Sequence, residues 1–323
     1  MTASPEQAAQ FAQLFHTLVA NVERAILGKT HVVELAVTAM ISEGHLLLED
    51  FPGTGKTSLA RALSQSVGGT SSRIQFTPDL LPGDVTGITV YDQKSGEFVF
   101  HNGPIFANIV LADEINRASP KTQSALLEVM EEGNVTVDGE TRRVADPFMV
   151  IATQNPVEQA GTYRLPEAQL DRFLLKTSLG YPDRNAMASI LESAGTRRHS
   201  TVLTPVMTPQ TLVGMIEMAK TVYIDPVIID YITRLVEATR SAVQVRLGAS
   251  VRGALALTRS AKTWAIAHGR NYVLPDDVKD LTQVVLAHRL ILDPEAEFDG
   301  VTADAVIARV LTDVLPPVQK AGV

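Results

Sequence analysis

Residues 50–57 are Asp50-Phe51-Pro52-Gly53-Thr54-Gly55-Lys56-Thr57. The apolar run His45-Leu46-Leu47-Leu48-Glu49 precedes them and is long enough for a buried strand. The run that follows is typical of the first turns of a helix: Ser58-Leu59-Ala60-Arg61-Ala62-Leu63. A strand, a glycine loop ending in Gly-Lys-Thr and a helix, in this order, are the context of a phosphate-binding loop. The stretch therefore predicts an α/β domain that binds a nucleotide.

Each residue type in this loop has a chemical reason to be there. Gly53 and Gly55 allow the backbone N–H groups to point at an anion, and the helix N-terminus adds partial positive charge. Lys56 is expected to reach the β- and γ-phosphates, and the Thr57 hydroxyl to hold Mg²⁺. The loop residues expected to bind the nucleotide are Pro52, Gly53, Thr54, Gly55, Lys56, Thr57 and Ser58.

One position departs from the pattern G-x-x-x-x-G-K-[ST], because Asp50 replaces its first glycine. The conformation of the first turn therefore stays open. A glycine-rich strand–helix turn that binds nothing is the alternative, and Lys56-Thr57 in this context argues against it.

Length and composition limit the classes of protein. The 323 residues suffice for two domains, and 45% hydrophobic and 20% charged residues are ordinary for a globular protein. A net charge of −8 argues against extensive nucleic-acid binding, and the lack of cysteine excludes disulfides and thiolate metal sites. The N-terminus lacks the pattern of a secretory signal and no run approaches the ~18 apolar residues of a membrane span. We therefore expect a cytoplasmic protein.

The apolar pattern changes along the chain. Buried strands are predicted at 107–112, 148–153 and 174–179, and hairpins at 88–100 and 135–144. A helix is predicted from Ser119-Pro120 to Gly133. Beyond about Asp183 no strand pattern persists, and Thr208-Pro209, Asp225-Pro226 and Pro275-Asp276 are typical helix starts. These patterns predict a doubly wound parallel sheet in residues 1–182 and an all-helical domain in residues 183–323.

Asp113 and Glu114 end the apolar run Ala107-Asn108-Ile109-Val110-Leu111-Ala112. Two carboxylates at the end of a buried strand can each have a different role. Asp113 can hold the magnesium shell, and Glu114 can orient and deprotonate an attacking water. A plain turn is the alternative, and the phosphate loop upstream favours the functional interpretation.

Four further motifs resemble the MoxR family of AAA+ ATPases. They are residues 113–123 (DEINRASPKTQ), 151–156 (IATQNP), 165–173 (LPEAQLDRF) and 248–252 (GASVR). The motifs occur in the same order as in the family, and the resemblance covers nearly the whole chain. Asp50 agrees with the family, whose members carry an acidic residue there. Val251 is a mild departure, because the family more often has proline.

The resemblance implies roles for four residues. Asn155 matches the sensor-one position beside the γ-phosphate, and the alternative is a turn residue before proline. Arg172 matches an arginine finger that acts on the ATP of the neighbouring subunit, a contact worth roughly 10³–10⁵ in rate in related chemistry. Arg252 matches sensor two in the lid, as the helical domain is called in this family. For either arginine, a surface residue is the alternative. Gly28 resembles the segment that lines the adenine pocket, and a helix C-cap is the alternative.

The two predicted hairpins occupy the places of the helix-two insert and the pre-sensor-one hairpin in this clade. In related motors these hairpins touch the substrate. Arg142 and Arg143 would then grip an acidic or polypeptide substrate. A solvated hairpin edge protected by charge is the alternative, and the sequence does not separate the two.

The resemblance implies ATP hydrolysis with Mg²⁺, held by Thr57 and Asp113, in a cleft at the carboxyl ends of the strands. The catalytic residues would be Glu114, Lys56, Asn155 and Arg172, and the active form would be a ring, expected to be a hexamer. Remodelling or maturation of protein complexes is the first expectation, including metal cofactor insertion, with a partner that carries a von Willebrand factor A domain. The alternatives are a chelatase-like ATPase subunit, a nucleic-acid-translocating motor and a regulatory module without turnover.

Overall fold

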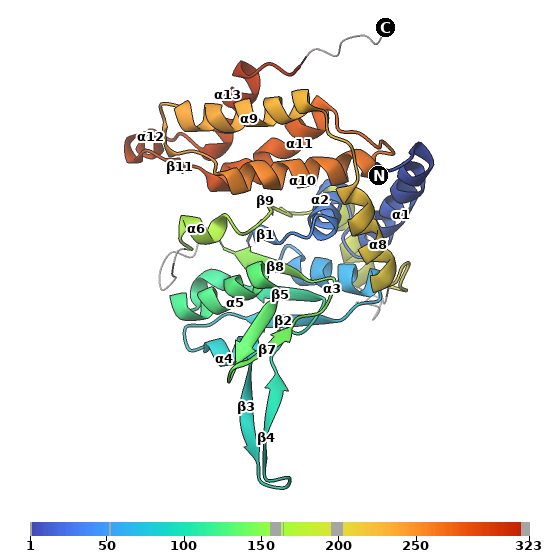
Figure 1. The fold of residues 1–323 in the computed structure, drawn as a ribbon, viewed down its shortest axis with the longest axis vertical. Coiled ribbons are helices and arrows are strands. Elements are labelled where there is room, and N and C mark those ends of the chain that lie inside the picture. The colour runs from blue at the N-terminus through green and yellow to red at the C-terminus, as the bar shows by residue number, and fades with distance from the viewer. Residues whose placement is uncertain (1, 52, 156–162, 164, 195–202, 318–323) are drawn as a thin grey trace. The chain divides into compact units, whose positions relative to one another are not determined.

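The structure is a computed structural model, and it describes residues 2–51, 53–155, 163, 165–194 and 203–317 (Figure 1). The chain forms two compact units. The core unit contains residues 17–173 and 177–214, and the lid unit contains residues 1–16, 174–176 and 215–323. The predicted boundary between residues 182 and 183 stays a prediction.

A five-stranded sheet with the order β2-β5-β8-β1-β9 lies at the centre of the fold. Its strands are β1 (Leu46–Glu49), β2 (Ser71–Gln75), β5 (Ile109–Asp113), β8 (Met149–Gln154) and β9 (Leu175–Thr177). The pairs β2–β5, β5–β8 and β8–β1 are parallel. Successive residues of β5, such as Leu111 and Ala112, point to opposite faces and are both buried. Helices therefore cover both faces, which explains the continuous apolar runs in the sequence and confirms the predicted doubly wound sheet.

Helices precede, connect and follow these strands. They are α1 (Pro5–Glu23), α2 (Thr30–Ile41), α3 (Lys56–Ser66), α4 (Pro82–Thr86), η1 (Ile115–Arg117), α5 (Pro120–Glu132), α6 (Glu167–Leu170), α7 (Arg184–Ala194) and α8 (Pro209–Lys220). Helix α5 begins as predicted, because the Ser119 hydroxyl accepts a hydrogen bond from the N–H of Thr122. It ends at Gly133, whose φ is +64°. Its Leu126 and Leu127 pack into one cluster with residues of β5 and β8.

Strand β2 is an addition to the predicted sheet. It pairs with β5 along its whole length, from Ser71 opposite Ile109 to Gln75 opposite Asp113. Ile74 is its buried residue, and the others are exposed or half-buried. An edge strand of this kind has no apolar run, so the sequence pattern did not predict it.

Both predicted hairpins are present. The first is β3 (Gly87–Asp92) with β4 (Glu97–Asn102), and it extends away from the sheet as a two-stranded ribbon (Figure 1). The second is β6 (Asn134–Val137) with β7 (Glu140–Arg143). The base of the first ribbon requires glycine, because a Cβ on Gly103 would lie 2.3 Å from the carbonyl oxygen of Val85.

The lid unit is mainly helical, as predicted. Its elements are α9 (Pro226–Ser241), β10 (Val245–Leu247), α10 (Val251–Ala267), α11 (Pro275–Leu286), η2 (Ala287–Arg289), β11 (Ile291–Leu292), α12 (Pro294–Phe298) and α13 (Ala303–Asp313). The short antiparallel pair β10–β11 was not predicted. Arg270 donates two hydrogen bonds of 2.6 Å to the buried carboxylate of Asp277 at the start of α11. These bonds raise the pKa of Arg270 and fix the loop before the helix.

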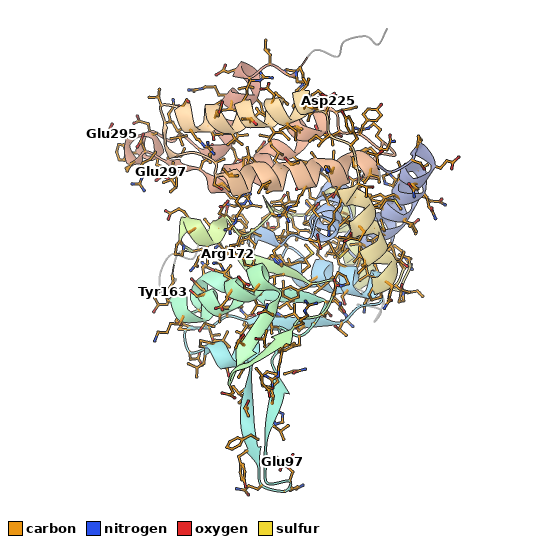
Figure 2. The ribbon with its side chains drawn as sticks, viewed as in Figure 1. Glu97, Tyr163, Arg172, Asp225, Glu295 and Glu297 are labelled. Carbon is orange, nitrogen blue, oxygen red and sulfur yellow. The ribbon has the colours of Figure 1, made fainter. Side chains whose placement is uncertain are left out.

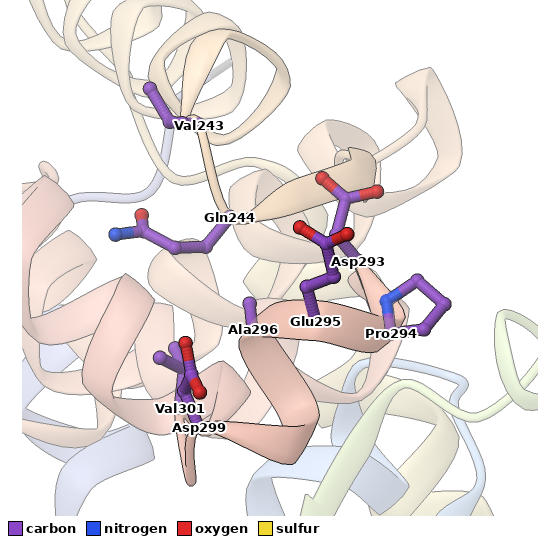
Figure 3. Close-up of a pocket in the computed structure, with 8 residues that line it drawn as sticks. All are labelled: Val243, Gln244, Asp293, Pro294, Glu295, Ala296, Asp299 and Val301. Atoms are coloured by element: carbon purple, nitrogen blue, oxygen red, sulfur yellow. The ribbon is translucent and has the colours of Figure 1, made fainter.

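A surface hollow lies in the lid unit between the 243–244 turn and α12. Its lining residues are Val243, Gln244, Asp293, Pro294, Glu295, Ala296, Asp299 and Val301 (Figure 3). None of the candidate site residues is among them. Across the described part of the chain, every helix is too short or too polar to cross a membrane.

Candidate nucleotide site

Three neighbouring strands of the core unit end at one edge of the sheet. The strands β5, β8 and β1 are adjacent and parallel, so their carboxyl ends lie together. Asp113 and Glu114 follow β5, Asn155 follows β8, and the phosphate loop follows β1. The N–H of Asp50 donates to the carbonyl oxygen of Gln154 at 3.0 Å, which holds the start of the loop beside β8. The fold therefore brings together the predicted phosphate loop, the carboxylate pair and Asn155, which is buried.

The loop backbone has the conformation that its glycines allow. The φ angles of Gly53 and Gly55 are +83° and +99°, and among the described residues, their chain neighbours aside, no atom lies within 4 Å of the place where a Cβ would stand on either residue. Helix α3 begins at Lys56, whose Nζ donates to the carbonyl oxygens of Asp50 (3.2 Å) and Phe51 (3.0 Å). Open space, a helix N-terminus and a lysine within the loop fit a phosphate group.

The remaining loop residues surround this space. The Thr54 hydroxyl donates to the carbonyl oxygen of Phe51 at 3.3 Å, whereas Thr57 and Ser58 are exposed in the first turn of α3. Helix α3 packs against β5, the strand that ends in Asp113. Pro52 lies outside the described residues.

The side chain of Asp50, which occupies the first position of the loop, is 2% exposed. Its carboxylate accepts hydrogen bonds from the hydroxyl of Ser178 (3.0 Å) and the N–H groups of Leu179 and Gly180 (2.5 and 3.0 Å). The aspartate thus ties the phosphate loop to the segment that follows β9. This contact answers the question that the sequence pattern left open at this position.

Asp113 is held on both carboxylate oxygens. Oδ1 accepts from the Thr153 hydroxyl at 2.7 Å, and Oδ2 accepts from Nη2 of Arg73 at 2.7 Å. The Arg73 side chain is 52% exposed, whereas Thr153 is fully buried. The threonine bond is therefore the better shielded of the two.

Glu114 has an uncommon backbone conformation for a residue other than glycine, with φ at +57°. Its Oε2 accepts from Gln75 Nε2 at 2.9 Å and from Arg117 Nη1 at 3.0 Å. Its N–H donates to the Thr153 hydroxyl at 2.8 Å. A strained residue held by several partners is a common feature of functional sites.

None of these four partners, Arg73, Gln75, Arg117 and Thr153, was predicted from the sequence as a partner of the carboxylates. Arg73 and Gln75 lie on β2, which lacks an apolar pattern. The sequence does contain a pattern that points to Thr153. The four apolar residues before it, 149–152, match the four before Asp113, 109–112. Aligning the two runs places Thr153 level with Asp113, as the observed register does.

Three predicted site residues belong to other elements of the chain. Arg172 donates to the carbonyl oxygen of Leu127 at 2.6 Å and pairs with Glu131 at 3.0 Å, and both partners belong to α5 (Figure 2). Arg252 is exposed in the first turn of α10, in the lid unit.

Gly28, between α1 and α2, has a φ of +71°. A Cβ at this residue would lie 3.3 Å from Cβ of Ala186 and 3.5 Å from Oδ2 of Asp183. Both the conformation and the close approach of α7 favour glycine here. These contacts leave its predicted role beside adenine untested.

Comparisons with known proteins agree with this arrangement. Residues 45–175 match the ATPase family associated with various cellular activities (AAA), and residues 237–310 match the AAA lid domain. The uncharacterized protein YeaC of Bacillus subtilis is 49% identical over 94% of this chain and 95% of its own. Chaperone MoxR1 of Mycobacterium tuberculosis is 41% identical over 98% of this chain and 86% of its own. A crystal structure from Cytophaga hutchinsonii, 36% identical, superposes with a TM-score of 0.91 over 97% of this chain and 98% of that chain.

Proposed function

Since the chain belongs to the MoxR family of AAA+ ATPases, we propose that it hydrolyses ATP with Mg²⁺ and works as a ring that remodels or matures protein complexes. The observation that carries this proposal is the convergence at one edge of the sheet. The phosphate loop, Asp113-Glu114 and Asn155 follow three adjacent parallel strands. A regulatory module without turnover would not need the second carboxylate or the polar residue after β8.

The residues of the loop and of β5 suit the proposed ligands. Lys56 and the N–H groups around Gly53 and Gly55 would bind the phosphates, where the backbone leaves open space. The Thr57 hydroxyl and the Asp113 carboxylate would hold Mg²⁺, which prefers oxygen ligands and binds through one or two carboxylates together with phosphates. When bound, Mg²⁺ would neutralise part of the phosphate charge.

The remaining groups have separate tasks. Glu114 would orient the attacking water and accept its proton, and Asn155 would help to place that water. Arg172 would reach the ATP of the neighbouring subunit. In the single chain it binds Leu127 and Glu131, so ring assembly would exchange these contacts for a phosphate oxygen. Arg252 and Gly28 would contact the nucleotide from the lid and beside the base.

The test is an ATPase assay with and without Mg²⁺, on the wild type and on Glu114→Gln and Lys56→Ala. The wild type should turn over ATP. Glu114→Gln should bind a fluorescent ATP analogue with normal affinity and lose at least about 10²-fold in kcat, because general base catalysis typically contributes that much. Lys56→Ala should lose binding as well. A Glu114→Gln variant that hydrolyses ATP at the wild-type rate would contradict the role of the glutamate.

The substrate on which this ATPase acts is proposed to be a protein. The relative from Mycobacterium tuberculosis is named a chaperone, and this chain carries a net charge of −8, which disfavours tracking along a nucleic-acid backbone. Single-stranded DNA should leave the ATPase rate unchanged. A partner protein with a von Willebrand factor A domain should copurify with the Glu114→Gln variant. Metal cofactor insertion is the proposed activity to assay in that complex. Stimulation by DNA would favour a nucleic-acid motor instead.

A further inference from the structure

We propose that Thr153 is the positioning residue of this site, and that its single hydroxyl fixes Asp113 and Glu114 relative to each other. The proposal rests on the proposed ATPase function. It concerns a residue outside the predicted phosphate loop, carboxylate pair and sensor positions.

The register of the sheet places Thr153 beside the carboxylates. Ala112 of β5 lies opposite Ala152 of β8, and the two strands are parallel. The next residues, Asp113 in β5 and Thr153 in β8, are therefore neighbours at the carboxyl ends of the two strands. Thr153 also lies opposite Leu48 of β1, so its backbone is paired on that side.

The hydroxyl of Thr153 is used as donor and as acceptor. It donates to Oδ1 of Asp113 at 2.7 Å and accepts from the N–H of Glu114 at 2.8 Å. A hydroxyl has one proton to give and lone pairs to accept with, so one atom serves both neighbours. The residue is fully buried, which shields both bonds from water.

The bond to the N–H of Glu114 has a specific consequence. Glu114 occupies the left-handed region with φ at +57°, where residues other than glycine are strained. The carbonyl oxygen of Glu114 accepts from the N–H of Arg117 at 2.9 Å, which holds one side of this backbone. Without the Thr153 bond, the N–H of Glu114 would lose its buried partner and this side of the backbone would be held less firmly. The water-activating carboxylate would then move relative to Asp113.

Other contacts of the two carboxylates do not replace this one. The Arg73 and Arg117 side chains are 52% and 42% exposed, and they hold the carboxylate oxygens without contacting the backbone of Glu114 in the described structure. Long exposed side chains also lose little when they move. Thr153 is therefore the contact that sets the geometry. The arginines add positive charge beside the carboxylates, and Gln75 donates a neutral hydrogen bond to Glu114.

The test compares Thr153→Val with Thr153→Ser. Valine keeps the branched shape and removes the hydroxyl, and serine keeps the hydroxyl. The matched control is Thr38→Val in α2, since Thr38 is also fully buried and its hydroxyl has no hydrogen-bond partner in the described residues. Three quantities are measured: the steady-state kcat, the KM for ATP, and the rate of hydrogen–deuterium exchange at the amide of Glu114. The exchange rate does not depend on activity.

We expect Thr153→Val to lower kcat by about 10²-fold, because small misplacements of a catalytic group have effects of this size. Its KM for ATP should stay within about threefold, since the phosphate loop is unchanged. The amide of Glu114 should exchange faster in this variant alone. Thr153→Ser should have the kcat and the Glu114 exchange rate of the wild type. Thr38→Val should also match the wild type in kcat and in this exchange rate.

The proposal is overturned if Thr153→Val keeps the wild-type kcat, if its Glu114 amide exchanges at the wild-type rate, or if Thr38→Val loses activity equally. An inactive wild type is a different result. An inactive wild type would contradict the proposed ATPase function itself, and with it the role of Thr153 in that function.

Discussion

At the scale of single residues, Asp50 shows how one carboxylate can replace a glycine in a phosphate loop. The usual glycine leaves space at this position. Here the carboxylate instead accepts hydrogen bonds from the Ser178 hydroxyl and from the N–H groups of Leu179 and Gly180. The segment after β9 therefore depends on a loop residue for its buried donors.

We predict that Asp50→Gly destabilises the core unit, although it restores the usual sequence pattern of the loop. It would leave buried donors without a partner, at a cost of about 2–4 kcal/mol in the free energy of unfolding. Urea denaturation would measure this cost. Glu128→Gln is the control, because Glu128 is exposed in the same unit and its replacement should not change the midpoint. An Asp50→Gly protein as stable as the wild type would show that the carboxylate is dispensable.

At the scale of elements, the two hairpins are joined by an arginine. The guanidinium carbon of Arg142, on β7, lies 4.1 Å from the centroid of the Phe100 ring on β4, and the same side chain pairs with Glu140. An isolated two-stranded ribbon is marginally stable in water. The contact therefore supports β3–β4 near its base.

We predict that Arg142→Ala speeds the hydrogen exchange of amides in β3 and β4, because loss of the cation–π contact removes about 1 kcal/mol of local stability. Arg143→Ala is the control, since Arg143 is the exposed neighbour and should leave exchange unchanged. The basal ATPase rate should stay normal in both. If the arginines instead grip a substrate, as the sequence allowed, both variants would lose partner-stimulated activity while exchange stays the same.

The elements that apolar patterning specifies were predictable, and the others were not. Strands β1, β5 and β8 are buried on both faces of the sheet. Their sequences are therefore continuous apolar runs, which can be recognised without a structure. Strand β2 lies at the edge, and its Arg73 and Gln75 serve the carboxylates of β5 rather than the core. The same applies to the site. Motif residues could be named from the sequence, whereas Thr153 and the partners of Asp50 depend on which strand ends become neighbours.

At the scale of the whole molecule, one chain does not contain a complete site under the proposed mechanism. Arg172 contacts α5 of its own core unit, through Leu127 and Glu131, and the proposed finger must come from a second subunit. A ring with head-to-tail interfaces supplies each site with the arginine of a neighbour. This arrangement predicts that two inactive variants can complement each other.

We predict that a reassembled equal mixture of Glu114→Gln and Arg172→Ala recovers about one quarter of the wild-type ATPase rate per subunit, because half of the sites keep Glu114 and half of those face an intact Arg172. Each variant alone should be nearly inactive. A mixture of Glu114→Gln and Lys56→Ala is the control. It should recover nothing, because Glu114 and Lys56 must come from the same subunit to build one site. If the first mixture also recovered nothing after subunit exchange had been verified, Arg172 would act within its own chain or not at all.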